Sequence, residues 1–535
     1  MVEISDSFSV MAQRVRDGAI VGLLLTGLFL AVSGLGWKLA GLPFVPLDLF
    51  DWIARVLPGS VLTAGIDWMV AISLALHVGN LSAAAKSTEQ LMAIAAALVI
   101  GGVVGSTLFV ILGYSEEPAA LPGAILGAIL GACAVLIESQ LNRIPSGASV
   151  SAAWVVGSFV AAGLAFGRIR DRLEEVGTGS YSDRPSTDPR MTSANVDRRR
   201  QVLLGLACAT GFSTVLTAIW SFASRRVRAP GARWSDDHQL PNAEAAVTPV
   251  AGTRRELTPL EDHYRIDIDT RVPTIDITRW RLKIGGLIDH PLELTLDQLR
   301  LEEPLYQFVT LSCISNPVGG DLIGTTRWTG VSLRRLVGRW SAGPRATHLK
   351  VMSADGFFET IALDFIERDP RVMLTYAWDS LPLLAEHGFP LRLYVPDLYG
   401  MKQPKWIVSI ELIDHWEPGY WVTRGWDREG RMKASSVVDA VDVRGAGADR
   451  EGRKTVPAGG IAHGGARGIS NVEVRVDAGE WHEARLRDPL SDTTWVLWRA
   501  NVLSAEGDHL ISVRCYEADG TPQAGGFHSR RLRLS

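Results

Sequence analysis

The chain has 535 residues and a formal net charge of −4, and 47 % of its residues are hydrophobic. This length exceeds what one hydrophobic core usually holds, so at least two or three domains are expected. The small net charge gives no indication of a nucleic-acid partner. The four cysteines are scattered without CxxC or Cys/His spacing, which argues against a structural zinc site and against a disulfide framework.

The composition changes sharply along the chain. Residues 18–222 are rich in Leu, Ala, Val, Ile and Gly, and five apolar runs in them reach membrane-spanning length: 18–40, 90–113, 119–138, 149–167 and 202–222. A sixth run, 61–82, is interrupted by Asp67 and His77, and we expect it to be re-entrant or to lie along the membrane surface. Residues 1–222 are therefore predicted to form an α-helical transmembrane bundle of five spans.

The charges beside the apolar runs predict their orientation. Arg14 and Arg16 precede the first run, and the stretch 168–200 contains eight arginines. By the positive-inside rule both regions are cytoplasmic, which requires an even number of crossings between them. The last run then leads outward, so residues 223–535 are expected outside the cytoplasm.

Glycines recur every fourth residue within two of the runs, at Gly101 and Gly105 and at Gly123, Gly127 and Gly131. Small residues at this spacing allow helices to approach closely in lipid. This pattern indicates helix packing rather than a pore.

The run Arg198–Arg200 allows two interpretations. It resembles a twin-arginine export signal, which serves folded proteins loaded with a cofactor, or it is simply a positive-inside anchor for the last span. Residues 223–258 are rich in Arg, Pro and Ala without periodicity and are predicted to be a linker that tethers the soluble half.

The soluble half divides into two predicted domains. Residues 259–435 alternate short strand-like segments with short helices at Thr295–Leu301 and Leu333–Trp340, which predicts a mixed α+β domain. Residues 436–467 are rich in Gly and Asp and are predicted to be a loop. Short alternating segments follow, and they indicate a small β-sandwich within a C-terminal domain, 436–535.

Two stretches carry the candidate chemistry. In Phe308–Gly320, a β-favouring run delivers Cys313 into a loop rich in Asn, Pro and Gly. A thiolate there could be the single protein ligand of a metal, although a lone cysteine is more often a small buried hydrophobic residue. The stretch 387–406 is more specific, because its glycines permit close backbone approach and its basic side chains suit a phosphate: His387, Arg392, Lys402 and Lys405.

The segments His387–Pro396 and Tyr399–Trp406, together with the Cys313 loop and Trp328–Val331, resemble the sulfite oxidase family of molybdopterin enzymes. The resemblance extends over about residues 262–535, and its C-terminal part is similar to the immunoglobulin-like dimerisation domain of that family. The resemblance therefore implies a molybdenum–molybdopterin cofactor, and it does not cover the membrane half.

The resemblance implies a role for each matching residue. Cys313 would be the protein ligand of molybdenum, and Arg265 would line the substrate pocket. The pterin and its phosphate would be bound by Asp355, His387, Arg392, Gly400, Lys402 and Lys405. The reaction would be two-electron oxo transfer at molybdenum between its +4 and +6 states.

The substrate pocket departs from the family pattern. Sulfite oxidases usually have an arginine a few residues after the ligand cysteine, where this chain has Asn316–Gly320. Trp426 lies nearest the position of the pocket tyrosine, with Tyr420 a less favoured substitute. Arg265 and Arg424 could still offset the charge of a desolvated anion. The less cationic pocket leaves open the uncharged sulfoxides that periplasmic methionine-sulfoxide reductases of the family handle.

The leading interpretation is a membrane-anchored molybdopterin-dependent oxidoreductase that acts on a small sulfur oxyanion such as sulfite, with S-oxide reduction as the alternative. The resemblance includes no haem domain, so a separate electron carrier is expected, either a cytochrome or a quinone-linked one. The C-terminal domain could pair two copies of the chain. A non-catalytic binding module without cofactor is the second class of function. A transporter is disfavoured, because the apolar runs contain few polar groups.

Overall fold

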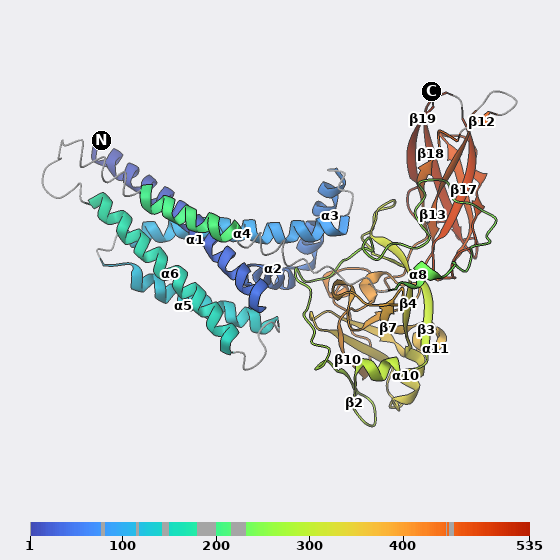
Figure 1. The fold of residues 1–535 in the computed structure, drawn as a ribbon, viewed down its shortest axis with the longest axis horizontal. Coiled ribbons are helices and arrows are strands. Elements are labelled where there is room, and N and C mark those ends of the chain that lie inside the picture. Colours follow the sequence, from blue (N-terminus) through green and yellow to red (C-terminus); the bar gives the residue numbers. More distant parts are fainter. Residues whose placement is uncertain are drawn as a thin grey trace. The chain divides into compact units, whose positions relative to one another are not determined.

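The computed structural model describes residues 2–75, 81–113, 117–141, 149–178, 200–215, 232–445, 447–448, 454–504 and 506–534. The chain forms two compact units (Figure 1). Unit 1 comprises Met1–Leu57, Lys86–Ala229 and Asp269–Arg271, and unit 2 comprises Pro58–Ala85, Pro230–Ile268 and Val272–Ser535. The chain therefore passes from one unit to the other several times.

Unit 1 is built from helices. They are α1 (Val2–Ala40), α2 (Val45–Val56), α4 (Leu81–Leu112) from Lys86 onward, α5 (Ala120–Gln140), α6 (Ser149–Thr178) and a helix over residues 200–215. Within the described ranges, four helical stretches are long and apolar enough to cross a membrane: Val10–Ala40, Lys86–Leu112, Ala120–Gln140 and Ser149–Glu174. They coincide with the first four predicted spans. The fifth run is helical as far as residue 215, while residues 216–222 and 198–199 lie outside the described residues.

Glycines bring two pairs of these helices together. A Cβ on Gly163 of α6 would overlap the backbone of Gly123 in α5, and a Cβ on Gly22 of α1 would overlap the backbone of Gly101 in α4. Such contact between backbones is possible only where the side chain is absent, and it supplies the van der Waals packing that holds helices together in lipid. The predicted packing role of the glycine repeats is confirmed.

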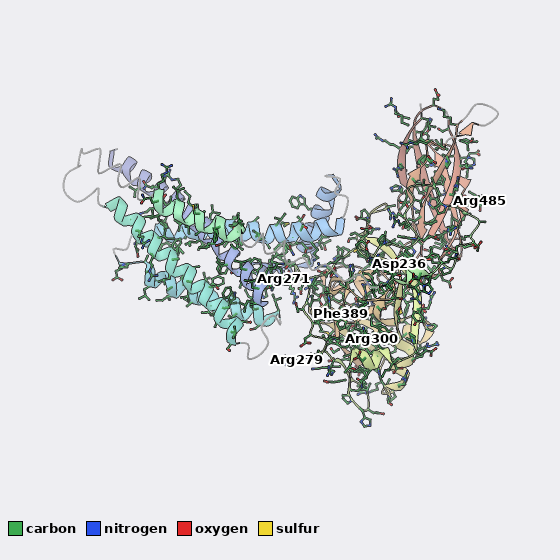
Figure 2. All side chains as sticks on the ribbon, viewed as in Figure 1. Asp236, Arg271, Arg279, Arg300, Phe389 and Arg485 are labelled. Atoms are coloured by element: carbon green, nitrogen blue, oxygen red, sulfur yellow. The ribbon has the colours of Figure 1, made fainter. Side chains whose placement is uncertain are left out.

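Helix α2 was not predicted from the sequence, and it binds a segment that lies far away along the chain. Three pairs join α2 to the segment Asp269–Arg271: Asp48 with Arg271, Asp51 with Thr270, and Arg55 with Asp269. Asp51 accepts hydrogen bonds from the N–H of Thr270 at 2.9 Å and from its hydroxyl at 3.0 Å. Arg271, labelled in Figure 2, is buried in unit 1 together with its partner Asp48. Pro46 in the first turn, followed by aspartates three residues apart, was the available signal for this helix.

Unit 2 contains the helix α3 (Gly59–Ala75), which covers most of the run that was expected to be re-entrant or surface-bound. Its first residue lies against the 3-10 helix η3 (Val422–Arg424), because a Cβ on Gly59 would overlap the backbone of Arg424. His77 lies outside the described residues. The relation of this run to a membrane stays a prediction.

The mixed domain of unit 2 contains two sheets (Figure 1). The first has the order β2 (Leu292–Leu294), β1 (Leu282–Gly286), β10 (Ile407–Ile413), β5 (His348–Ser353) and β6 (Phe358–Ala362), and only β1 and β10 run parallel. The second has the order β3 (Pro304–Ser312), β4 (Ile323–Ser332), β7 (Met373–Trp378) and β8 (Leu381–Pro382), with β9 (Arg392–Tyr394) also on β7. The predicted α+β architecture of this domain is confirmed.

Three short helices connect the strands: α9 (Leu296–Arg300), α10 (Leu333–Arg339) and α11 (Leu363–Arg368). The sequence signals for α9 hold in detail, since Thr295 caps the helix and forms a reciprocal pair of hydrogen bonds with Gln298. Apolar residues of both sheets and of α10 share one buried core, which includes Leu282, Leu336, Leu349, Leu374 and Leu412. This core fixes the strands whose ends carry the candidate site.

The C-terminal part of unit 2 consists of two antiparallel sheets. One contains β11 (Ser435–Val441), β13 (Lys454–His463), β17 (Val496–Ser504) and β16 (Arg485–Leu486), with β12 (Gly447–Ala448) on β13. The other contains β15 (His482–Glu483), β14 (Ile469–Val476), β18 (Gly507–Glu517) and β19 (His528–Leu534). Both sheets contribute to one core, which includes Val456, Val472, Trp498, Ile511 and Leu532.

The prediction of a loop over residues 436–467 is wrong, because this stretch contains β11 and most of β13. Its glycines serve close backbone packing: a Cβ on Gly460 would overlap the carbonyl of Val437 on the neighbouring strand. Glycine in a strand can mark close approach of another backbone rather than a break. The alternating apolar residues around the glycines, Val456, Ala458 and Ala462, were the overlooked signal.

Residues 232–258 also differ from the expected tether. They include the short helix α8 (Trp234–Asp237), and Val247 and Val250 are buried. Glu256 forms an ion pair of 3.0 Å with Arg487 of the C-terminal sheets. This stretch therefore packs against the folded domain, and its lack of periodicity reflects an irregular backbone rather than a free chain.

Candidate active site

Cys313 is the first residue after β3 and is buried. Its N–H donates to the carbonyl of Leu322 (2.9 Å), and the N–H of Leu322 donates to Oδ1 of Asn316 (2.9 Å), so the loop between β3 and β4 is closed at its base. The Sγ atom lies 3.1 Å from Oγ of Ser315. Burial raises the pKa of the Cys313 thiol, and the contact with Ser315 partly offsets this rise. A nearby positive charge or a metal would favour the thiolate.

Arg392 stands at the start of β9 and is almost completely buried. One Nη donates to the carbonyl of His387 (3.1 Å), and the guanidinium lies 4.5 Å from the ring centroid of Trp328. Its Nε has no hydrogen-bond partner within the part of the chain that the structure describes, and no carboxylate there forms an ion pair with it. Burial lowers the pKa of Arg392 to about 10. A cation buried without a counter-charge is unfavourable unless an anion from outside the chain joins it.

Lys405 lies beside this arginine and is better satisfied. Its Nζ donates to the carbonyl of Ile266 (3.0 Å) and lies 3.3 Å from both the carboxylate of Asp267 and the carbonyl of Glu386. Burial lowers the pKa of Lys405 to about 8, and Asp267 works against that shift. The charge of Lys405 is therefore disfavoured by burial and favoured by the neighbouring carboxylate of Asp267.

Two further predicted cofactor ligands, His387 and Lys402, are also buried. His387 ends the 3-10 helix η1 (Ala385–His387), and burial together with the nearby His263 holds its pKa well below the usual range. Lys402 ends η2 (Gly400–Lys402) and pairs with Glu359 at 3.1 Å. Burial raises the pKa of Glu359, whereas Lys402 opposes the rise.

The next two predicted cofactor ligands are Gly400 and Asp355. A Cβ on Gly400 would lie 2.9 Å from the hydroxyl of Tyr264 and 3.6 Å from the carbonyl of Ser312, so this glycine lies close to the end of β3. Asp355 is buried, accepts a hydrogen bond from the N–H of Phe357 (3.0 Å) and contributes to the electrostatic surroundings of Lys405. Arg392 and Lys405 thus lie near His387, and Asp355 lies near Lys405.

Arg265, the predicted substrate residue, forms an ion pair of 2.7 Å with Asp267. The same carboxylate lies near Lys405, so Asp267 is shared by two cations. Arg265 is among the positive charges that lower the pKa of His387, as are Arg392 and Lys405, so Arg265 lies near these residues. Asp267 was not predicted, and its position two residues after Arg265 on an extended segment was the only available signal.

His263 and Tyr264 were also missed. The His263 ring lies 5.6 Å from that of His387 and 5.3 Å from that of Trp378, measured between centroids. Its Nε2 is buried without a hydrogen-bond partner among the described residues, and burial lowers the pKa of His263 to about 3. Tyr264 is buried beside Cys313, and burial raises its pKa well above the usual value.

The predicted pocket aromatics lie in one cluster of rings. Tyr420 is buried with its ring 5.6 Å from that of Phe357, and the guanidinium of Arg424 lies 3.5 Å from the Tyr420 ring centroid. Trp426 packs against Trp421 with the ring centroids 5.6 Å apart. Its indole Nε1 is buried and has no partner within the described residues. Trp426 therefore keeps a hydrogen-bond donor at the position predicted for the pocket tyrosine.

The donor set fits an anionic, phosphate-bearing cofactor. Arg392 offers a buried guanidinium whose Nε is unpaired in the described chain, and His263 adds a second unpaired buried nitrogen. Across the described residues, no group of three or more His, Cys, Asp or Glu side chains could hold a metal ion.

Comparison with known proteins agrees with this chemistry. Residues 269–421 match the family model of the oxidoreductase molybdopterin binding domain. The uncharacterized oxidoreductase YuiH of Bacillus subtilis (strain 168) is 28 % identical over 155 residues, which cover 29 % of this chain and 76 % of that protein. The mitochondrial sulfite oxidase of Macaca fascicularis is 27 % identical over 293 residues, which cover 46 % of this chain and 53 % of the relative. The chain thus spans only about half the length of that sulfite oxidase.

Two further matches are a reductase subunit and a solved structure. The putative protein-methionine-sulfoxide reductase subunit YedZ1 of Azospira oryzae is 27 % identical over 187 residues, which cover 35 % of this chain and 68 % of that protein. The crystal structure of the sulfane dehydrogenase SoxCD from Paracoccus pantotrophus has a TM-score of 0.44 and 19 % identity, and the match covers 56 % of this chain and 85 % of that chain.

The matched domain, with its lone cysteine and buried cations, defines an oxidoreductase that binds molybdenum–molybdopterin. Residues 269–421 thus form a molybdopterin-binding oxidoreductase domain that is similar to the corresponding part of the sulfite oxidases. The resemblance drawn from the motifs at Cys313 and at residues 387–406 is confirmed, as are the cofactor and the enzyme class.

Proposed function

We propose that this chain is a membrane-anchored enzyme that catalyses two-electron oxo transfer on a small sulfur oxyanion such as sulfite. The observation that carries the proposal is the buried guanidinium of Arg392, with its unpaired Nε, in the same cluster as His387 and Lys405. A fixed cation of this kind binds a phosphate through charge-assisted hydrogen bonds. The bound cofactor supplies the oxo-transfer chemistry, and the protein supplies its placement.

Each residue of the site has a proposed role. Cys313 is the protein ligand of the metal, and its loop is closed at the base by Leu322. The pterin and its phosphate are bound by Asp355, His387, Arg392, Gly400, Lys402 and Lys405. Because burial keeps His387 and His263 neutral, they can donate or accept single hydrogen bonds without adding charge.

Arg265 orients the anionic substrate in this proposal, and Arg424 could assist it. Replacing Arg265 with Gln should raise KM for sulfite about tenfold, which corresponds to about 1.4 kcal/mol. Arg279→Gln, a change at an exposed arginine labelled in Figure 2, is the matched control. Steady-state kinetics of the purified full-length enzyme with an artificial electron acceptor would measure both variants. An unchanged KM in Arg265→Gln would remove this residue from the substrate pocket.

Reduction of S-oxides is the second candidate, and one observation favours it. The charge of Arg265 is already paired with Asp267 at 2.7 Å, and the loop Asn316–Gly320 has no charged side chain. A pocket with few free cations suits an uncharged sulfoxide better than an anion. The relative from Azospira oryzae carries the name of a methionine-sulfoxide reductase subunit. Turnover of methionine sulfoxide, with no oxidation of sulfite, would establish this alternative.

The arrangement in the cell is also a proposal. Four apolar helices support membrane association. We propose multiple crossings, a catalytic domain outside the cytoplasm, and electron exchange with a separate cytochrome or quinone-linked carrier. The proposed domains are a helical region over 1–222, a linker over 223–258 whose part from residue 232 onward packs against the folded domain, a catalytic domain over 259–435, and an immunoglobulin-like dimerisation domain over 436–535. Protease protection in intact and inverted vesicles would test the orientation.

A non-catalytic binding module remains the contrasting hypothesis. Elemental analysis and pterin fluorescence of the full-length protein, made in a host that assembles the cofactor, separate the two. About one molybdenum and one pterin per chain is expected for the enzyme. Protein without either would contradict the enzymatic proposal and support the binding module.

A further inference from the structure

The strand that delivers Cys313 lies at the edge of its sheet. Among the strands that the structure describes, β3 pairs only with β4. An edge strand presents unpaired N–H and C=O groups, and it can shift or fray unless something covers it. Movement of β3 would displace Cys313, which follows its last residue directly.

A loop of the C-terminal domain, Ser491–Trp495, covers the open edge of β3. The N–H of Thr310 donates to the carbonyl of Thr493 (3.0 Å), and the N–H of Trp495 donates to the hydroxyl of Thr310 (2.8 Å). The carbonyl of Phe308 accepts from the hydroxyls of Ser491 (2.7 Å) and Thr493 (2.8 Å). The loop thus continues the hydrogen bonding of the sheet through side chains as well as backbone.

A second contact holds the far end of the cysteine loop. Arg254 donates to the carbonyl of Gly319 (3.1 Å) and pairs with Asp439 of β11 (3.0 Å). The imidazole of His528, from β19, lies so close to Gly319 that a Cβ there would come within 2.5 Å of Nε2. Gly319 has a φ of 88°, so both its conformation and this contact require glycine. His528 is fixed in turn, since its Nδ1 accepts from the N–H of Val438 (3.1 Å).

The spacing of these contacts matters for a metal ligand. Thr310 lies three residues before Cys313 and Gly319 lies six residues after it, so the cysteine is bracketed by contacts with the C-terminal sheets. A ligating side chain works only when its orientation is fixed by the groups around it, and loss of such support typically changes metal binding or activity 10- to 100-fold. A domain that only paired two copies of the chain would not need these contacts with the Cys313 loop.

We propose that the C-terminal domain positions the molybdenum-ligand loop, with Ser491, Thr493 and His528 as positioning residues. This inference rests on the proposed role of Cys313 as the metal ligand. The loop Ser491–Trp495 fixes the end of β3, and His528 with Arg254 fixes the loop at Gly319. The domain would thereby set the geometry of the thiolate at the metal.

A pair of substitutions at Thr493 tests the proposal in the loaded full-length enzyme. Thr493→Val removes the hydroxyl with little change in shape, and Thr493→Ser restores it. We expect Thr493→Val to shift the thiolate-to-metal charge-transfer band and the electron paramagnetic resonance g values of bound molybdenum. Alkylation of Cys313, followed by peptide mass spectrometry, should become at least tenfold faster. Thr493→Ser should return both readouts to those of the unaltered protein.

Further variants separate positioning from general loss of stability. Ser491→Ala removes one hydrogen bond to Phe308 and should act in the same direction as Thr493→Val. Ser512→Ala removes a hydroxyl contact with Ser529 between β18 and β19, and it should leave the metal spectrum unchanged. If Thr493→Val and Ser491→Ala keep the native spectrum and alkylation rate, the positioning role is wrong.

A different result would contradict the proposed role of Cys313 as the metal ligand. If Cys313→Ser leaves the metal spectrum of the unaltered protein unchanged, Cys313 is not the ligand, and the proposed site itself is contradicted. If Cys313→Ser changes the spectrum while the Ser491 and Thr493 variants do not, the site stands and only the role of the C-terminal domain is overturned.

Discussion

At the scale of single residues, the candidate site is dominated by burial of charge and of hydrogen-bonding groups. Arg392 and His263 each keep a buried nitrogen without a partner in the described chain. Burial lowers the pKa of Arg392 to about 10 and that of His263 to about 3, so the arginine still carries its charge near neutral pH whereas the histidine does not. One fixed cation beside neutral donors is an arrangement that suits a phosphate attached to a polar ring system.

The first prediction concerns Arg392. Arg392→Lys keeps the charge but loses the planar set of donors and the stacking on Trp328, which lies 4.5 Å away. A hydrogen bond to a charged group contributes about 1.5–3 kcal/mol, so pterin affinity should fall roughly 10- to 100-fold. Pterin fluorescence and molybdenum content of the purified full-length protein would report the loss. Arg368→Lys, at an exposed pair with Asp364, should retain full cofactor content.

The second prediction concerns acid stability. The folded pKa of His263 is about 3, well below that of an unfolded histidine, so the unfolded chain binds an extra proton at acid pH. Stability contributed by this group is therefore complete above about pH 6.5 and falls as the pH drops toward 3, by about 1.4 kcal/mol per pH unit. His263→Gln should flatten the dependence of the melting temperature on pH within this window.

His463→Gln provides the matched control, since burial lowers the pKa of His463 to about 4. His463 lies in the C-terminal sheets and contacts Met432, so its replacement should also flatten the pH dependence while cofactor content stays unchanged. An unaltered pH profile in His263→Gln would mean that His263 is charged in the folded protein.

At the scale of elements, apolar helices and capped helices could be predicted from the sequence, because their signals are local. The first four spans follow from length and composition, and α9 follows from Thr295 and Gln298. β13 could not be predicted from its glycines, because their value lies in contact with a neighbouring strand that is distant in sequence. α2 was missed for a similar reason, since the partners of its aspartates come more than 200 residues later.

The candidate site likewise contains residues that could be predicted from local sequence and residues that could not. Cys313 and the basic residues of 387–406 could be predicted because their types and order are specific. Asp267 and His263 could not, because their contribution depends on which strand ends meet in space. The support of β3 by the loop Ser491–Trp495 was equally out of reach, since nothing local in either segment indicates the other.

A third prediction compares two glycines on one helix. Gly163→Ala places a methyl group against the backbone of Gly123 and should destabilise the α5–α6 pair by about 1–3 kcal/mol. Gly157 lies on the same helix, and a Cβ there meets nothing within 4 Å. Gly157→Ala should therefore be neutral or slightly stabilising, because alanine favours the helix by about 0.5–1 kcal/mol. Thermal unfolding of the detergent-solubilised protein would measure both, and equal effects would contradict the predicted close packing.

At the scale of the whole molecule, the chain does not divide once into a membrane part and a soluble part. The segment Asp269–Arg271 belongs to unit 1, while the residues before and after it belong to unit 2. Asp267, which lies near Lys405, precedes this segment by only two residues. Two residues of extended chain span at most about 7 Å. The segment that packs within unit 1 therefore begins only two residues along the chain from a residue that lies near Lys405.

The last prediction tests how firmly that segment is held. Asp48 and Arg271 form a buried ion pair, and loss of one partner from such a pair typically costs about 3–5 kcal/mol because the other charge stays buried. Asp48→Asn should release Arg271, so trypsin should cleave after Arg271 at least tenfold faster than in the unaltered protein. Glu303→Gln, which removes the exposed partner of Arg335, should leave this cleavage unchanged. If Asp48→Asn is cleaved no faster while the protein remains folded, the Asp48–Arg271 pair does not hold this segment, and the other contacts of the segment, among them the Asp51 hydrogen bonds and the Arg55–Asp269 pair, hold it instead.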